Sequence, residues 1–285
     1  MMPDVGLLDA LRGGPRTISP TAHYTGYVWA HTGLGPGELA TLEGRVMYAG
    51  LQPLNWISDR LGGPTLPGAL LSRHRRIDDL LTEGIESGRI SQVVEIASGM
   101  SPRGYRFTQR YDVDALTYVE ADLPGMVARK KKALARLSSS PSHRVVEVDA
   151  LRDRGPGSLE ELLGGLDQTS GLAIVTEGLV NYLPTDLVLG LWSRVAAGLS
   201  SFEHGTYLSD YFFPGTISAP LERVAGGLLG VFVRSGTYLH FEDEASLSNA
   251  LRTAGFAAVT VHHPEDTGPE ELRRSGATVR VIEAT

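Results

Sequence analysis

The 285-residue chain contains no cysteine, which excludes disulfides, thiolate metal sites and a cysteine nucleophile. No apolar run approaches the roughly 20 residues that a membrane-spanning helix needs. Acidic residues outnumber basic ones, and the net charge of −7 argues against a nucleic-acid partner and against attraction to an anionic membrane. The opening residues, MMPDVGLLDALRGG, lack the basic start and the long apolar core of a secretory signal, so we expect a cytoplasmic protein.

The remaining composition is that of a globular enzyme. Hydrophobic residues make up 42% of the chain and charged residues 21%, which is the usual balance for a folded domain. The length allows one large α/β domain with additions. Neither an HxxxH pattern nor clustered Asp and His residues indicate a metal site, and we expect none.

Residues 92–124 predict a strand, a glycine turn, a short helix and a second strand. The β-branched run 92–96 ends abruptly in small residues, as a buried parallel strand that feeds a tight turn should. The second apolar run, 116–119, stops before Glu120 and Asp122. In a right-handed βαβ unit both strands end at the same edge of the sheet, so we expect the turn and the two carboxylates to face one crevice.

This arrangement fits a nucleoside, because the backbone can pass close beneath it and a carboxylate can accept hydrogen bonds from ribose hydroxyls. A dinucleotide fingerprint needs three glycines at fixed offsets, whereas this turn has Ala97, Gly99 and Gly104. Pyrophosphate is therefore disfavoured, and S-adenosylmethionine, which carries no phosphate, fits better. The residues alone leave open a βαβ unit of another doubly wound protein, with Glu120 and Asp122 as solvated strand-end acids.

Four segments carry a resemblance to a known family. They are 72–79 (SRHRRIDD), 92–104 (QVVEIASGMSPRG), 118–131 (YVEADLPGMVARKK) and 176–184 (TEGLVNYLP). In content and order they resemble the leucine carboxyl methyltransferase family, whose bacterial branch includes tetracenomycin-type polyketide O-methyltransferases. At the first turn the family often shows Gly-Ala-Gly followed by Asp-Thr-Arg. Here Arg103 is present, but Ser101 stands where the acid is usual.

The resemblance implies a Rossmann-like class I methyltransferase, an α/β protein with a seven-stranded, mostly parallel sheet. It also implies an N-terminal helical lid, residues 1–88, packed on a methyltransferase domain, residues 89–285, with a cap insertion at about 212–240. The runs near 257–263 and 278–283 match the antiparallel pair of strands that closes such sheets.

The same resemblance assigns a donor site. Arg73 would pair with the carboxylate at the methionine end of the donor, for which a planar guanidinium is suited; a solvated charged helix face is the alternative. Asp149 would accept from the adenine amino group, and Glu177 would lie near the ammonium or the reacting methyl. The full set expected to bind S-adenosylmethionine, with S-adenosylhomocysteine as product, is Arg73, Glu95, Ala97, Gly99, Arg103, Glu120, Asp122, Asp149, Ala150 and Glu177.

Three residues are catalytic candidates. Tyr24 lies on a helix predicted from residue 21, whose aromatic face is either a substrate lid or simple packing. Tyr182 either lines the substrate side or packs. His240, like His23 and His31, is a candidate base for a phenol acceptor, whereas a carboxylate acceptor is already ionised and needs no base.

The expected function is O-methylation of a small-molecule carboxylate, in polyketide or other secondary metabolism, by a monomer or homodimer. Methylation of a phenol or enol, and a non-methylating protein that keeps the fold, are the alternatives. A nicotinamide oxidoreductase is disfavoured by the missing third glycine. The basic run 129–132 is expected to be a solvated helix face, because four consecutive residues point in all directions around a helix.

Overall fold

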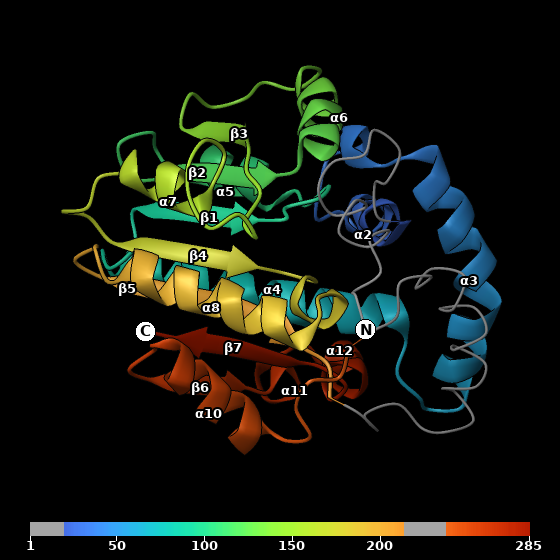
Figure 1. Cartoon of the computed structure of the whole chain (residues 1–285). Coiled ribbons are helices and arrows are strands. Elements are labelled where there is room, and N and C mark those ends of the chain that lie inside the picture. Colours follow the sequence, from blue (N-terminus) through green and yellow to red (C-terminus); the bar gives the residue numbers. More distant parts are fainter. Residues whose placement is uncertain (1–19, 214–237) are drawn as a thin grey trace, which may run out of the picture. The chain divides into compact units, whose positions relative to one another are not determined.

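The computed structural model describes residues 20–213 and 238–285 (Figure 1). Their seven strands belong to a sheet of order β3-β2-β1-β4-β5-β7-β6. The chain folds as two compact units, one comprising residues up to 48 together with 92–166, and the other comprising 49–91 with 167–285. The predicted division into a lid (1–88) and a methyltransferase domain (89–285) stays a prediction, and most of the expected cap insertion lies outside the described residues.

The first unit contains three parallel strands: β1 (Gln92–Ile96), β2 (Thr117–Asp122) and β3 (His143–Glu147). All five residues of β1 are buried, which agrees with its β-branched residues, and the polar Gln92 and Glu95 are buried with them. Two helices, α5 (Arg103–Arg110) and α6 (Pro124–Leu134), pack on β2 and β3. The other helical segments of this unit are α2 (Pro20–His31), η1 (Gly37–Leu39) and α7 (Leu159–Gly164).

The second unit contains the parallel strands β4 (Leu172–Thr176) and β5 (Gly205–Tyr211). Strand β7 (Arg280–Ala284) runs antiparallel to both β5 and β6 (Val259–His262), which confirms the antiparallel pair expected from the sequence. Helix α8 (Thr185–Leu199) packs on β4 and β5, and α4 (Leu66–Glu86) packs on β5 and β7 (Figure 1). The remaining segments are η2 (Val180–Tyr182), α10 (Glu244–Ala254), α11 (Pro264–Thr267) and α12 (Glu270–Gly276).

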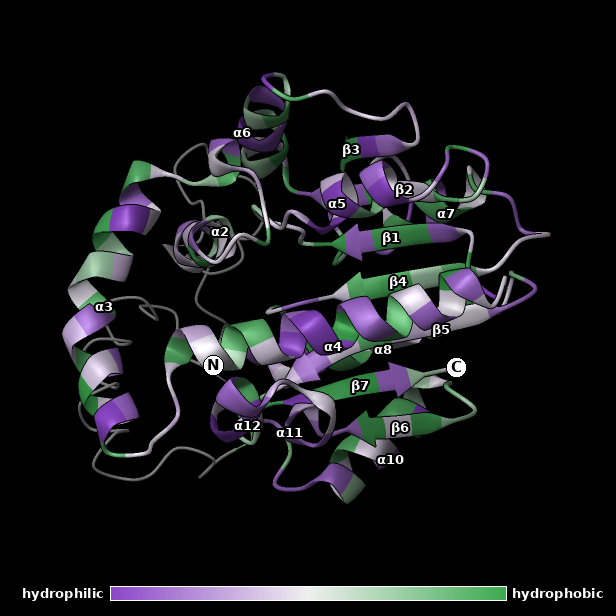
Figure 2. Cartoon of the chain, turned by 180° about the vertical axis from the view of Figure 1, so that it is seen from behind, coloured by the Kyte–Doolittle hydropathy of each residue, from purple (hydrophilic) through white to green (hydrophobic). Residues whose placement is uncertain are grey.

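Helix α3 (Leu42–Arg60) runs from the first unit into the second. The break that follows it ends at Thr65, whose Oγ1 accepts a hydrogen bond from the Gly68 backbone N–H and so caps α4. Figure 2 shows the apolar character of β4 and the mixed surface of α4, which is the pattern of a buried strand and of a helix with one solvated side. Within residues 20–213 and 238–285, no helix has both the length and the apolar character needed to cross a membrane.

Two expectations about the first unit are wrong. Strand β2 does not stop before Glu120 but continues to Asp122, so Glu120 is an interior strand residue with a fully buried side chain. The run 129–132 is not uniformly solvated either, because Lys130 is 1% exposed, whereas Lys131 and Lys132 are exposed as expected. Lys130 Nζ lies 2.9 Å from Glu120 Oε2, and His143 Nε2 lies 3.2 Å from the same oxygen.

The buried pair explains why a lysine is tolerated in the core. Burial alone would raise the pKa of Glu120, but the neighbouring Lys130 and His143 more than offset it, so the pKa lies below its ordinary value. The carboxylate therefore stays ionised and requires its cationic partners. Gly104 completes the arrangement, because a Cβ at this position would lie only 2.6 Å from Glu120 Oε1 and 2.7 Å from His143 Nε2.

We predict that Lys130→Ala lowers the free energy of unfolding by about 3 kcal/mol, because it leaves the Glu120 carboxylate buried without its ammonium partner. Urea unfolding of the purified protein at neutral pH measures the change. Lys131→Ala, one residue along the same helix but exposed, is the matched control and should change stability by less than about 0.5 kcal/mol. Equal effects of the two substitutions would contradict the role assigned to the pair.

Candidate functional site

The turn after β1 has an unusual backbone that is held closed by one carboxylate. Ala97 and Gly99 both have φ of +53°, and Ala97 is the only non-glycine residue with positive φ among those the structure describes. Asp122, the last residue of β2, accepts hydrogen bonds from two backbone N–H groups, with 2.7 Å from Gly99 N to Oδ2 and 2.7 Å from Leu123 N to Oδ1. A left-handed alanine is strained by roughly 1 kcal/mol, and such strain concentrates at ligand-binding turns.

Ser98, between these two residues, has a buried hydroxyl that the protein leaves unsatisfied. The residue is 5% exposed, and within the described residues its Oγ has no hydrogen-bond partner. Its backbone is engaged, with N–H donating to Ala121 O and C=O accepting from Ser101 N. A buried hydroxyl without a partner is unfavourable by about 1–3 kcal/mol, so its retention beside the strained turn calls for a reason other than stability. Sequence reasoning missed Ser98 because a serine among small turn residues carries no distinct signal.

Two residues predicted to bind S-adenosylmethionine, Glu95 and Arg103, instead bind each other. Arg103 Nη1 donates to Glu95 Oε1 at 2.7 Å, and the Tyr118 hydroxyl donates to Glu95 Oε2 at 2.7 Å. All three side chains are essentially fully buried. Burial, followed by the adjacent Glu95 carboxylate, raises the pKa of Tyr118 well above its ordinary value, so the phenol remains a donor. This network fixes the start of α5 against β1 and β2.

Asp149 and Ala150 follow β3, as expected from the sequence. Asp149 is partly exposed; its backbone N–H donates to Gly157 O at 2.8 Å, and its Oδ1 accepts from Leu151 N at 3.1 Å. The carboxylate therefore caps its own turn and retains lone pairs for a further donor. Asp122 is similar, since each of its oxygens accepts one backbone bond and keeps a second acceptor site.

The second unit holds Arg73 between two carboxylates. From α4, Arg73 Nε lies 3.2 Å from Glu177 Oε1, and Arg73 Nη1 lies 2.6 Å from Asp210 Oδ2. Glu177 follows β4 directly, and Asp210 lies in β5. The Oδ1 of Asp210 also accepts a hydrogen bond from Gly178 N at 2.6 Å. Gly178 has φ of +68°, and a Cβ there would lie 2.9 Å from Arg73 Nη2. The structure thus brings Arg73 and Glu177 together and adds Asp210 of β5 to them.

The charges of this cluster support one another. Burial would lower the pKa of Arg73, but the carboxylates of Asp210 and Glu177 more than offset it and raise the pKa above its ordinary value. Burial also raises the pKa of Asp210, and the attraction of Arg73 opposes that shift. With a guanidinium 2.6 Å away and a backbone donor on its other oxygen, the Asp210 carboxylate is ionised. The default interpretation of residues 72–79 as a solvated face therefore fails for Arg73, although Arg75 is exposed.

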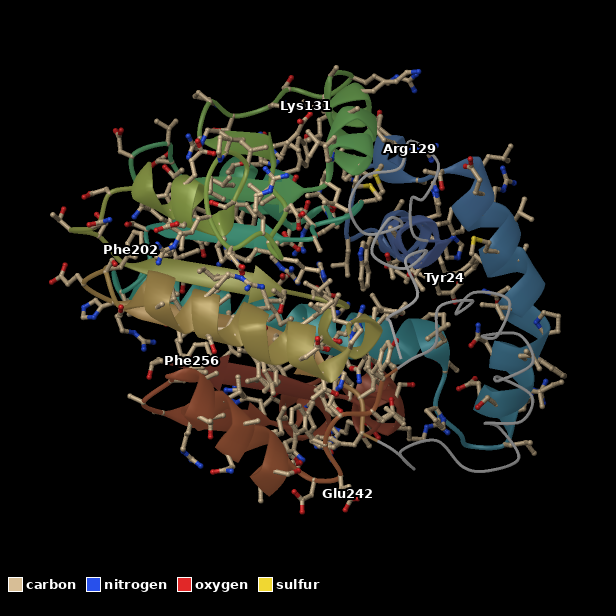
Figure 3. The ribbon with its side chains drawn as sticks, in the orientation of Figure 1. Tyr24, Arg129, Lys131, Phe202, Glu242 and Phe256 are labelled. Atoms are coloured by element: carbon tan, nitrogen blue, oxygen red, sulfur yellow. The ribbon has the colours of Figure 1, made fainter. Side chains whose placement is uncertain are left out.

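Tyr24, a catalytic candidate, is 2% exposed and packs against Tyr48 with ring centroids 6.1 Å apart (Figure 3). On the same helix, His23 Nδ1 lies 2.9 Å from Thr41 Oγ1 and 3.2 Å from Arg129 Nη1 of α6. Burial, and then the charge of Arg129, lower the pKa of His23. These contacts show what α2 packs against; a catalytic role for Tyr24 stays a prediction.

The two other catalytic candidates lie in the second unit. His240 Nδ1 lies 2.7 Å from Thr185 Oγ1, its Nε2 lies 3.2 Å from Val180 O, and burial lowers its pKa. Both ring nitrogens therefore already have protein partners. Tyr182 closes η2 and is half-buried. Its role, like that of His240, stays a prediction.

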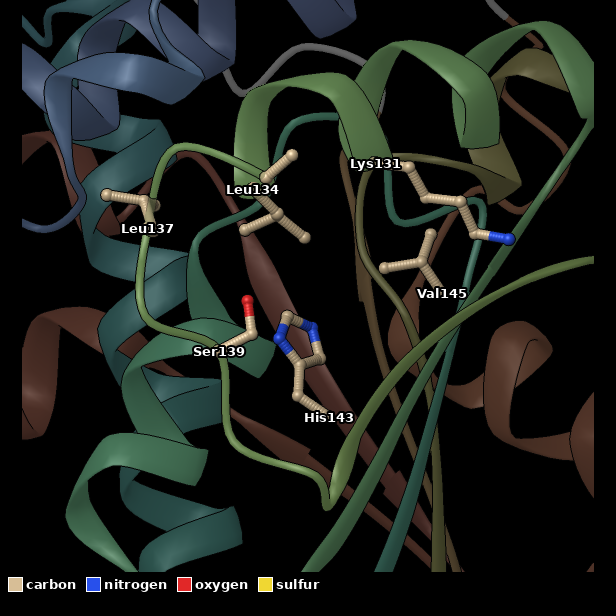
Figure 4. Close-up of a pocket in the computed structure, with 7 residues that line it drawn as sticks. Lys131, Leu134, Leu137, Ser139, His143 and Val145 are labelled. Atoms are coloured by element: carbon tan, nitrogen blue, oxygen red, sulfur yellow. The ribbon is translucent and has the colours of Figure 1, made fainter.

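A surface cavity of about 290 Å³ lies elsewhere, between α6 and β3 (Figure 4). It is lined by Lys131, Leu134, Ala135, Leu137, Ser139, His143 and Val145. None of these seven is among the predicted donor-binding or catalytic residues. The residues predicted to bind the donor lie outside this cavity.

The fold places the chain in a class. A sheet of order β3-β2-β1-β4-β5-β7-β6, with β7 antiparallel to its neighbours and acidic residues at the end of β2 and after β3 and β4, defines the Rossmann-like fold of class I methyltransferases. Two solved structures share this fold. A DUF574 family protein from Streptomyces avermitilis has a TM-score of 0.64 at 16% identity, covering 97% of this chain and 98% of that one. A provisionally named methyltransferase from Thermobifida fusca has a TM-score of 0.58 at 12% identity, covering 100% and 98%.

Sequence comparison narrows the class to a family. Residues 46–196, more than half of the chain, match the model of the family described as leucine carboxyl methyltransferase. The chain belongs to the leucine carboxyl methyltransferase family, as the four sequence segments indicated.

Relatives in mycobacteria are provisionally named S-adenosyl-L-methionine-dependent methyltransferases. The one from Mycobacterium sp. strain KMS is 34% identical over 148 residues, which is 50% of this chain and 46% of the relative. The one from Mycolicibacterium paratuberculosis is 31% identical over 207 residues, 67% of this chain and 65% of the relative. The chain thus spans between about half and two thirds of the length of these relatives.

We predict that Gly178→Ala destabilises the protein by about 2–3 kcal/mol, because it adds a strained left-handed backbone and a Cβ that presses on the buried Arg73 guanidinium. Gly88→Ala is the matched control: Gly88 has φ of +74° with nothing within 4 Å of its Cβ position, so it reports the backbone strain alone, about 1 kcal/mol. Urea unfolding of both variants gives the difference. Identical losses would show that Arg73 does not need the space at Gly178.

Proposed function

We propose that the chain is an S-adenosylmethionine-dependent methyltransferase that methylates an oxygen atom of a small molecule, with a carboxylate as acceptor. The observation that carries the proposal is the turn at residues 97–99, closed by Asp122 and holding a buried, unsatisfied hydroxyl at Ser98. Membership of the leucine carboxyl methyltransferase family and the names of the mycobacterial relatives support it.

The residues present fit this donor. Ser98 Oγ needs a polar partner, and Asp122 and Asp149 keep acceptor sites for hydroxyl and amino groups of a nucleoside. Arg73 and Glu177 would address the carboxylate and the ammonium of the amino-acid end. When bound, S-adenosylmethionine supplies the electrophilic methyl group and the leaving group.

The work left to the protein is positioning. The chain would hold the acceptor oxygen in line with the donor's methyl group and exclude water, which by itself accounts for a large part of the rate enhancement of displacement reactions. Glu95 and Arg103 serve this indirectly, because their buried pair fixes the helix that follows the turn. Glu120, whose carboxylate lies against Lys130 and His143, is proposed to hold β2 in place rather than to contact the donor directly.

A carboxylate acceptor is favoured over a phenol or enol by two considerations. The family is named for carboxyl methylation. A carboxylate is also ionised at neutral pH and needs no general base, and His240, the base candidate, has both nitrogens engaged and a pKa lowered by burial. Phenol or enol methylation is the second candidate, with an aromatic polyketide-type acid or phenol as the acceptor class to be screened. The active species is proposed to be a monomer or homodimer.

We predict micromolar binding of S-adenosylmethionine and S-adenosylhomocysteine in calorimetric titrations, and no binding of NAD. Ser98→Ala should weaken binding of both sulfur nucleosides by about five- to tenfold, the effect of one hydrogen bond to a ligand. The same substitution should leave the ligand-free protein as stable as before or more stable, because it removes an unsatisfied hydroxyl.

Ser101→Ala, three residues along the turn, is the control for Ser98→Ala. Its Oγ accepts a bond from its own neighbour, Arg103 N, at 3.3 Å. Binding of NAD in preference to the sulfur nucleosides would overturn the proposed donor. Unchanged affinity of Ser98→Ala would remove the observation that carries the proposal.

The acceptor class can be read from the chemistry of the product. With a methyl-labelled donor and an aromatic acid that carries both a carboxyl and a phenol group, we predict label that mild alkali releases as methanol, since esters hydrolyse and aryl ethers do not. Label that resists alkali would overturn carboxyl methylation in favour of the phenol alternative. The same acid with its carboxyl group amidated is the control and should accept no label.

A further inference from the structure

His74 stands beside Arg73 on α4 and is the least exposed residue of the Arg73 cluster, at 0%. Its Nδ1 lies 2.8 Å from Glu177 Oε2, and its Nε2 lies 3.8 Å from Asp78 Oδ2, one helical turn along α4. Two consecutive residues of one helix, Arg73 and His74, therefore hold the two oxygens of the same carboxylate. The sequence-based assignment of this segment did not include His74.

The position of one proton follows from these contacts. Since Glu177 Oε1 accepts from Arg73 Nε, we take the carboxylate as the acceptor at its other oxygen too, which assigns the hydrogen of the 2.8 Å contact to Nδ1 of His74. The Nε2 contact with Asp78, at 3.8 Å, is too long for a hydrogen bond. The bond that matters for Glu177 is therefore donated by one identified atom.

This bond also determines how Arg73 is presented. Arg73 Nε donates a hydrogen bond to Glu177 Oε1, and Arg73 Nη1 donates one to Asp210 Oδ2, so both nitrogens already have partners within the protein. Among the described residues Nη2 makes no hydrogen bond, and it lies close to Gly178, where an added Cβ would stand 2.9 Å from it. If Glu177 rotated, the guanidinium would lose one of its two anchors and Nη2 would no longer have a fixed direction.

We infer that His74 is a positioning residue: by donating Nδ1–H to Glu177 Oε2, it fixes Glu177 and through it the Arg73 guanidinium, whose Nη2 then binds the carboxylate at the amino-acid end of the donor. The inference rests on the proposed donor. A positioning role differs from a purely structural one in a measurable way. Changing His74 should weaken the binding of ligands that have an amino-acid end and leave the binding of ligands without one unchanged.

Three substitutions separate the roles of the two ring nitrogens. In His74→Asn the amide nitrogen stands close to the position of Nδ1 and can still donate to Glu177. In His74→Gln the longer side chain carries its amide near the position of Nε2, on the Asp78 side. His74→Leu keeps a side chain of similar volume but has no polar nitrogen at either the Nδ1 or the Nε2 position. Arg75→Gln, on the exposed face of the same helix, is the control.

The experiment is calorimetric titration of the full chain and of each variant with S-adenosylhomocysteine and with 5′-methylthioadenosine, which has the same nucleoside but no amino-acid end. We expect His74→Leu and His74→Gln to weaken S-adenosylhomocysteine about tenfold while 5′-methylthioadenosine changes by less than about twofold. His74→Asn and Arg75→Gln should stay within about threefold for both ligands. Thermal unfolding without ligand identifies any variant that is not folded, and His74→Gln carries the test if His74→Leu does not fold.

The outcomes separate the inference from the function on which it rests. Equal weakening of both ligands, or no weakening of S-adenosylhomocysteine by His74→Gln, would overturn the positioning role while the donor assignment stands. His74→Asn as weak as His74→Leu would overturn the assignment of the bond to Nδ1. Failure of the unaltered chain to bind either ligand would overturn the proposed donor and the inference together.

Discussion

The need to neutralise carboxylates inside a sheet shapes this protein more than any other interaction. An ionised carboxylate deprived of water is penalised by several kcal/mol unless a cation and hydrogen-bond donors replace the solvent. Both units meet this requirement within the chain. The pairs are Glu95 with Arg103, Glu120 with Lys130, and Asp210 with Arg73. Each pair joins a strand to a helix, so the electrostatic requirement also ties each of these helices to the sheet.

The same requirement divides the acidic residues by task. The carboxylates with cationic partners are held by contacts within the protein and have few acceptor positions left for a ligand. Asp122 and Asp149 are different, because their carboxylates accept hydrogen bonds from backbone N–H groups and each can accept further bonds. In Asp122, burial raises the pKa although the Gly99 and Leu123 amides act in the opposite direction, so the group is held at some energetic disadvantage. An acid retained in that condition next to a strained turn is typical of a ligand-binding position.

The fold was largely predictable because its strands are short, apolar and bounded by glycine or acidic residues. The limits of β1 agree with the sequence pattern, and β6 and β7 lie where the antiparallel pair was expected. The order of sites along the chain was accessible through the family resemblance. What could not be predicted was which charged residues would be buried: Lys130 lies in a run of four basic residues, and only the three-dimensional register shows that it alone points at Glu120. His74 was missed for the same reason, since a histidine in an arginine-rich helix carries no sign of the carboxylate that it meets more than a hundred residues later.

Ala97 has an evolutionary consequence. It occupies the first position of the turn where the family often shows glycine, and it adopts a left-handed backbone that glycine would adopt without strain. Alanine is strained there by roughly 1 kcal/mol, yet it also restricts the unfolded chain, which stabilises the fold by about 0.4–1 kcal/mol relative to glycine. The two terms nearly cancel, so the position can drift between alanine and glycine with little effect on stability. Motifs defined by a strict glycine at this turn would therefore overlook chains such as this one that keep the same backbone by other means.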